Sequence, residues 1–122
     1  MKKAPDTDLT IINATYEFVV WSCQHLAKFP RNHRYVLGAR IESRIYDVLE
    51  NLIQAKYSSD KVELLQQANV WLELLRFQFR LAKDLKCLSL ESYGHSAKLI
   101  NDIGVQLGGW MKQAQRRVAT PT

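Results

Sequence analysis

Residues that end helices are few in this sequence, and their spacing is the strongest constraint on its fold. Pro30 is the only proline away from the two ends, and the chain has five glycines. Between the breaks near Pro30, Ser58 and Ser89, apolar residues recur at intervals of three and four, the period of one face of an α-helix. No Asn-Gly or Asp-Gly hairpin dipeptide and no alternating strand pattern occurs. The sequence therefore predicts an all-α protein.

Four helices are predicted, at residues 9–28, 33–56, 60–85 and 90–117. Asp8 or Thr10 can cap the first helix. Asp60 and Glu63 have the spacing of a capping box at the start of the third. Connections of about three to five residues favour antiparallel neighbours. We therefore expect one domain, residues 1–122, folded as an up-down-up-down four-helix bundle.

The periodicity also predicts which residues form the core. In the first helix the apolar face consists of Ile12, Tyr16, Val19, Val20, Cys23, Leu26 and Ala27. In the third, the most regular of the four, it consists of Val62, Leu65, Ala68, Leu72, Leu75, Phe79 and Ala82. We expect these faces to pack against one another in the centre of the bundle.

Two of the predicted helices carry more apolar residues than one face can hold. Between Val70 and Leu81 the polar interruptions are Glu73, Arg76, Gln78 and Arg80. In the last helix, the residues outside its main apolar face are Leu99, Ile103, Val105 and Trp110. Two apolar faces on an outer helix indicate a second subunit, so we expect a homo-oligomer. The alternative is that Trp71 and Trp110 close the ends of the core within one subunit.

The charge balance is basic and uneven. Seventeen lysines and arginines against twelve aspartates and glutamates give a net charge of +5, which favours polyanionic partners. The densest group lies around Pro30 and comprises Lys28, Arg31, Arg34, Arg40 and Arg44, with His25 and His33 nearby. Glu42 is the only acid among them. The sequence therefore predicts a basic corner where the first helix meets the second.

A second basic group lies on the third helix. Arg76, Arg80 and Lys83 are three or four residues apart, so they project from one side. Arginines beside aromatic rings such as Phe77 and Trp71 suit phosphate contacts combined with base stacking. Local ion pairs, Glu73 with Arg76 and Arg80 with Asp84, are an equally consistent interpretation. Both interpretations stay open at this point.

The remaining candidates for contact with a polyanion such as nucleic acid are Arg31, Arg34, Arg40, Arg44, Lys112, Arg116 and Arg117. Arg40 and Arg44 are one turn apart, and either could instead pair with Glu42 or Asp47. The last three have no acid nearby, so they are freer to meet a polyanion. They are also explained as a solvated helix end, where the helix dipole favours positive charge.

Chemistry beyond binding is not indicated. The three histidines lack a second histidine or a glutamate at metal-binding spacing. Gly104, Gly108 and Gly109 lie inside a helical pattern, so they cannot form a phosphate-binding loop, and close helix packing is the expected role. We therefore expect no catalytic residue, no metal and no cofactor, and we interpret the protein as one that is not an enzyme.

The cysteines, the lengths of the apolar runs and the first residues predict a cytoplasmic protein. Cys23 and Cys87 are far apart and form no Cys-x-x-Cys pair, so reduced thiols are expected. No apolar run approaches the roughly 18 residues of a membrane span. The first residues include two lysines but continue with Asp6 and Asp8 rather than an apolar segment, which is unlike a secretory signal.

Three blocks, taken together, resemble a known family. They are Phe-Pro-Arg-Asn-His-Arg-Tyr-Val-Leu-Gly-Ala-Arg-Ile at 29–41, Leu-Arg-Phe-Gln-Phe-Arg-Leu-Ala-Lys-Asp-Leu at 75–85, and Ile-Gly-Val-Gln-Leu-Gly-Gly-Trp at 103–110. In this order and at these separations they resemble the accessory variability determinant proteins of diversity-generating retroelements, across residues 10–117. A broader group, the four-helix bundles encoded in ribosomal-RNA intervening sequences, shares the Phe-Pro start of the second helix.

The resemblance implies more than the residue pattern does. Members of the accessory family are small basic four-helix bundles that assemble as barrel-like homopentamers. They bind the reverse transcriptase of the retroelement and nucleic acid, either template RNA or DNA, and support mutagenic retrohoming without being catalysts. By motif, Arg76 and Arg80 are the first choice for contact with the polymerase or its nucleic acid. Arg31, Arg34 and Arg40 are the second choice, whereas Gly104, Gly108 and Trp110 are structural.

Three functional hypotheses therefore stand. The first is an accessory subunit of a retroelement reverse transcriptase. The second is a bundle of the intervening-sequence type with a structural or unknown role. The third is an enzyme, which would require His25, Cys23 or His95 to lie beside a carboxylate.

Overall fold

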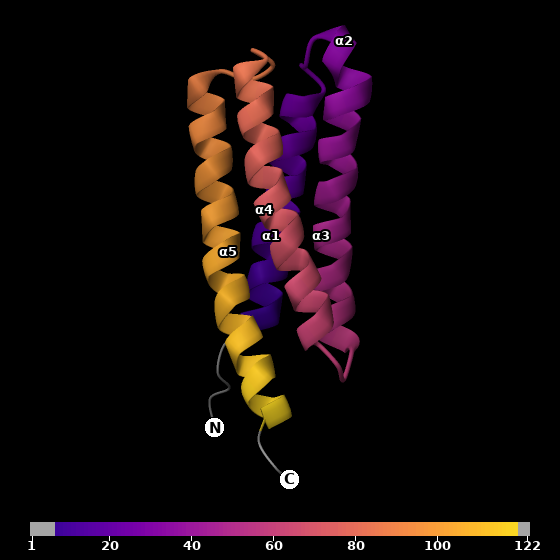
Figure 1. The fold of residues 1–122 in the computed structure, drawn as a ribbon, viewed down its shortest axis with the longest axis vertical. Coiled ribbons are helices and arrows are strands. Elements are labelled where there is room, and N and C mark those ends of the chain that lie inside the picture. Colours follow the sequence, from indigo (N-terminus) through magenta and orange to yellow (C-terminus); the bar gives the residue numbers. More distant parts are fainter. Residues whose placement is uncertain (1–6, 120–122) are drawn as a thin grey trace.

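Four long helices lie side by side and alternate in direction (Figure 1). A computed structural model describes residues 7–119, and within this range the regular structure is entirely helical. The long helices are α1 (Thr7–Leu26), α3 (Ala39–Tyr57), α4 (Val62–Asp84) and α5 (Leu90–Ala119). Contacts of α1 with α3 and α5, and of α4 with the same two, close them into a bundle. The all-α bundle predicted from the breaks is confirmed.

The core runs the length of the bundle, and α4 supplies its most regular row. Leu65, Ala68, Leu72, Leu75, Phe79 and Ala82 are all buried, as the periodicity predicts. From α3 the buried residues are Ile41, Ile45, Val48, Leu52 and Ala55. From α5 they include Ile100, Ile103, Leu107 and Trp110. In mid-bundle the rings of Phe18 and Phe79 lie 5.9 Å apart, which joins α1 to α4.

The predicted core face of α1 is displaced by about one residue, except at Leu26, which is buried as predicted. The buried row is Ile11, Thr15, Phe18, Ser22 and Leu26, whereas Tyr16 and Val20 are exposed. Two hydroxyl residues lie in this row. Thr15 Oγ1 donates to the carbonyl oxygen of Ile11 at 2.8 Å, so its hydroxyl is satisfied within the helix. Ser22 Oγ is buried without a hydrogen-bond partner among the described residues.

The turn between α3 and α4 is held by a lysine. Lys61 Nζ donates to the carbonyl oxygens of Ala55 and Ser58, both at 2.7 Å, and more weakly to that of Lys56 at 3.3 Å. A cation at this end of α3 satisfies carbonyls that have no partner inside the helix. The predicted capping box at Asp60 is wrong, because α4 begins at Val62 after Lys61, with no side-chain cap.

The connection between α4 and α5 is a Schellman turn. Lys86 has a φ of 65°, and Cys87 N donates to the carbonyl oxygen of Ala82 at 2.8 Å. Ser89 then caps α5, since its Oγ accepts a hydrogen bond from Ser92 N at 3.0 Å. This short connection places the start of α5 beside the end of α4.

The end of the bundle between α1 and α3 has an unusual backbone. The short helix α2 (Arg31–His33) leads into the π-helix η1 (Arg34–Gly38), which continues as α3. Phe29 is fully buried beneath this segment, and a Cβ at Gly38 would lie 3.4 Å from its ring. The wider π turn leaves Tyr35 and Val36 70% and 72% exposed. The helix predicted at 33–56 therefore begins earlier and is not uniformly α-helical.

Candidate nucleic-acid and partner interface

The three basic residues of α4 do not share one environment. Arg76 is held against α5: its Nε donates to Glu73 Oε1 at 3.0 Å, and its Nη2 would lie 3.3 Å from a Cβ at Gly104. It also lines a hollow of about 110 Å³ beside Tyr93. The local pair of Glu73 with Arg76, one of the two interpretations left open by the sequence, is therefore present. Arg76 joins two helices, and only part of it faces solvent.

Lys83 is packed between helices, whereas Arg80 is exposed. Lys83 Nζ lies 3.3 Å from Asp84 Oδ1 and 4.9 Å from the centre of the Tyr93 ring, so it too packs between α4 and α5. Arg80 is exposed, and its side chain has no ion pair or hydrogen bond within residues 7–119. The expected pair of Arg80 with Asp84 does not form. Of the three, Arg80 alone presents a free guanidinium in the part of the chain described.

In the basic corner, too, some arginines contact neighbouring elements and others are exposed. Arg34 Nε donates to the carbonyl oxygen of Phe29 at 3.3 Å, which ties η1 to the turn that follows α1. Arg44 lies 5.8 Å from the centre of the Trp71 ring and 4.0 Å from Asp47, so it connects α3 to α4. This contact places Trp71 beside α3 rather than beside the α4 arginines as expected.

Arg31 and Arg40 are the free arginines of that corner. Both are exposed, and neither side chain has a partner among the described residues. They lie on either side of η1, whose exposed Tyr35 and Val36 add apolar surface next to the charges. At the far end of α5, Lys112, Arg116 and Arg117 are also exposed. These cations have the accessibility that phosphate contacts require.

A second apolar face was expected on both α4 and α5. The structure has one on α4, whereas on α5 two of the four residues expected there are buried in the core. Val70, Leu74, Phe77 and Leu81 form an exposed row along α4, which we call the outer row, and Phe77 is 64% exposed. On α5, however, Ile103 and Trp110 belong to the core. The expectation that they lie outside it is wrong for both, and Trp110 follows the alternative in which it closes the core of one subunit.

The small residues of α5 are not explained by close helix packing. A Cβ at Gly108 or Gly109 would meet no atom within 4 Å, and at Gly104 it would approach only the end of Arg76. The predicted packing role is therefore wrong within the subunit for Gly108 and Gly109. At Gly104 the neighbour is a flexible arginine and not a helix backbone.

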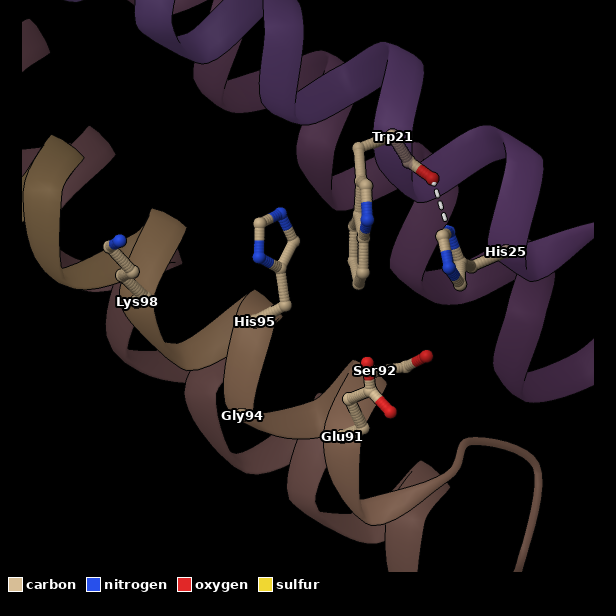
Figure 2. A pocket seen from close by; sticks show the side chains of 7 residues that line it. All are labelled: Trp21, His25, Glu91, Ser92, Gly94, His95 and Lys98. Carbon is tan, nitrogen blue, oxygen red and sulfur yellow. Dashed lines mark hydrogen bonds between the residues drawn. The ribbon is translucent and has the colours of Figure 1, made fainter.

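One side-chain cluster was not anticipated from the sequence. Trp21 and His25 of α1 and His95 of α5 line one hollow of about 500 Å³, with Trp21 between the two histidines (Figure 2). The His25 ring stacks on the indole at 4.0 Å, and the His95 ring lies 5.2 Å from it. Sequence spacing relates Trp21 to His25, but nothing in it relates either to a residue of the last helix.

Cys23 lies apart from these histidines. Its Sγ is 3.5 Å from Tyr46 Oη, across the contact between α1 and α3. This hydrogen bond raises the pKa of the Tyr46 phenol, and burial and the nearby Glu42 add to the effect. Burial raises the pKa of the Cys87 thiol. Within residues 7–119, no group of three or more His, Cys, Asp or Glu side chains could hold a metal ion.

A comparison with known protein families tests the resemblance found in the sequence. The family model described as bAvd-like matches residues 9–114, from the first turn of α1 into the last turns of α5. The chain belongs to the bAvd-like family. This confirms the resemblance to accessory variability determinant proteins and suggests a role as an accessory protein of a retroelement. A search of curated proteins finds no match to this chain. Among the described residues, no helix has the length and hydrophobicity to cross a membrane.

Proposed function

We propose that this protein is a non-catalytic accessory subunit of a diversity-generating retroelement, which binds the reverse transcriptase and its template RNA or cDNA. The family match over residues 9–114 is the observation that carries the proposal. A net charge of +5 supports it, because affinity for a polyanion rises with the number of cations available for phosphate contacts.

We assign phosphate contacts to four of the exposed cations that have no side-chain partner. They are Arg31, Arg40, Arg80 and Lys112, each exposed and without a side-chain partner in the described part of the chain. Arg34, Arg44, Arg76 and Lys83 have neighbours in the bundle and serve mainly to position its helices. Binding then holds template and polymerase together, and the bundle supplies no reacting group.

The proposal includes assembly as a homopentamer. The outer row of α4 gives each subunit an apolar strip, Val70, Leu74, Phe77 and Leu81, that its own core does not cover. Removing such a strip from water favours association, and a closed ring lets every subunit bury it. Arg80 lies on α4 between Phe77 and Leu81, so assembly would set the free guanidiniums at the edge of each subunit contact.

Salt dependence of RNA binding tests the phosphate contacts. With four contacts to a single strand, raising salt from 50 to 200 mM should weaken binding about 50-fold, because counterions released on binding oppose it. Arg80→Ala should reduce the slope of log affinity against log salt by about 0.7, whereas the partly packed Arg76→Ala should change it less. Fluorescence anisotropy of a labelled template RNA measures both. Affinity that does not change with salt would contradict the proposal.

Co-purification tests the partner. The neighbouring reverse transcriptase and its template RNA should be retained by the tagged wild-type protein, and less by a variant carrying Arg31→Ala, Arg40→Ala and Arg80→Ala. Light scattering on the same samples should give a mass of about five subunits for both. A pentamer that retains neither partner would reject this function and favour the intervening-sequence alternative.

A further inference from the structure

The hollow between α1 and α5 is lined by none of the residues assigned to phosphate contacts. Its volume of about 500 Å³ falls within the range of sites for small ligands. The lining residues are Trp21 and His25 from α1 and Glu91, Ser92, Gly94, His95 and Lys98 from α5. None of these side chains is used by the contacts assigned to the accessory function, so their arrangement requires an explanation of its own.

Three rings form a row across this hollow. Figure 2 shows the Trp21 indole in the middle, with His25 on one side and His95 on the other. His25 is held in place because its Nδ1 is hydrogen-bonded to the carbonyl oxygen of Trp21 at 2.9 Å. The indole also lies near Phe79 of α4, whose ring centre is 6.4 Å away. His95 is exposed and forms the open end of the row.

The charges of the hollow are separated along α5. Lys98 lies one turn beyond His95, on the outer side of its ring in Figure 2, and has no side-chain partner among the described residues. Glu91 lies two turns before Lys98, about 10 Å along the helix axis. Gly94 leaves the wall between them open, since a Cβ there would meet no atom within 4 Å. A flat ring can therefore approach His95 with an anionic group directed toward Lys98.

We propose that this hollow binds one nucleotide whose base is unpaired. The base stacks on His95 at the end of the ring row, and its phosphate pairs with Lys98. A base inside a duplex is stacked and paired, so it cannot enter. The inference rests on the proposed function for one source of the nucleotide, a single strand bound by the cations. A free mononucleotide has the same chemistry and is the other source.

Single-stranded and duplex RNA of equal length distinguish this site from the phosphate contacts. His95→Ala should weaken binding of an eight-nucleotide single strand about tenfold and leave duplex binding unchanged, because stacking of one base is lost. His95→Phe, which keeps a ring, should restore binding to within about twofold of wild type. Lys98→Ala should weaken the single strand selectively, whereas Lys112→Ala, the matched charge control on α5, should weaken strand and duplex alike.

Tryptophan fluorescence with adenosine monophosphate as the probe separates the two proposals. Quenching should occur in the wild type and disappear in His95→Ala and in Trp21→Phe, which retains a ring against Phe79. If no RNA binds but adenosine monophosphate quenches the wild type and neither variant, the accessory function fails and the nucleotide site stands. If His95→Ala affects neither the single strand nor the mononucleotide, or lowers single-strand and duplex affinity equally, the nucleotide site is wrong.

Discussion

The two apolar faces of α4 contain the same kinds of residue and have opposite surroundings. Leu72 and Leu75 on the inner face are at most 1% exposed, whereas Leu74, on the outer row, is 43% exposed. Burying a leucine contributes about 1.5 to 3 kcal/mol, so the inner face stabilises the subunit and the outer row adds little to its fold. The energetic role of an apolar residue is set by what covers it, and one helix can serve a core and an interface together.

Arginines on the same helix repeat this contrast. Arg76 reaches over Gly104 toward α5 and pairs with Glu73, whereas Arg80, one turn later, has no side-chain partner within residues 7–119. Residue type and spacing are alike for the two. The two lie one turn apart on one side of α4, so the neighbours that each guanidinium meets decide whether it helps to hold α4 against α5 or stays exposed.

The largest effect is expected on the inner face. Leu72→Ala should lower the free energy of unfolding by about 2 to 5 kcal/mol, because it leaves a cavity in a packed core. Leu74→Ala, the matched change on the outer row, should cost less than about 0.5 kcal/mol in the dissociated subunit. Urea unfolding at low protein concentration measures both. Equal losses would remove the distinction between the two faces.

A charged substitution on the outer row should change assembly and leave the subunit folded. Leu74→Glu combined with Phe77→Glu places two carboxylates in the proposed interface, where burying an unpaired charge is costly. Light scattering should then give about 14 kDa, the mass of one chain, with unchanged helical circular dichroism. Tyr16→Glu, on an exposed apolar residue of α1, is the control and should keep the oligomer. An oligomer that survives the double change would place the interface elsewhere.

Replacing Arg76 and replacing Arg80 should have different effects on the free energy of unfolding. Arg76→Ala should cost about 0.5 to 1 kcal/mol, since it removes an ion pair and side-chain packing over α5. Arg80→Ala should cost nothing measurable. Thermal unfolding of the two variants under identical conditions gives the comparison, and a larger loss for Arg80→Ala would contradict the assignment of Arg76 as the packed residue.

The smallest effect is expected at the hydrogen bond between α1 and α3, a polar contact that belongs to neither face of α4. The pKa of Tyr46 is raised in the folded protein, so the fold retains a proton that the unfolded chain loses above about pH 10. This contribution to stability is complete below that pH and is lost as pH rises. The fall in unfolding free energy between pH 8 and pH 11 should therefore be smaller for Tyr46→Phe than for the wild type. Equal falls would show that the bond with Cys23 is not formed.

The sequence predicts the elements well where apolar residues alone mark a face. Six of the seven core residues expected on α4 are fully buried. On α1 the prediction is displaced, because Thr15 and Ser22 occupy buried positions that hydrophobicity does not mark. The turn at Lys61 was missed for a related reason. Its carbonyl partners, Ala55 and Ser58, belong to the end of the preceding helix, whereas the capping-box pattern considers only Asp60 and the three residues after it.

The helix period and the long helices follow from the amino-acid sequence, because each depends on residues that are close together along the chain. Net charge follows as well, because it is a sum over the residues whatever the fold. The availability of a charged or aromatic side chain does not, because its partner comes from another helix. Arg44 meets Trp71 across two helices, and His95 meets Trp21 across most of the chain. Packing of the four helices therefore decides which arginines stay exposed without a partner, and it creates a hollow between α1 and α5 that no sequence spacing indicates.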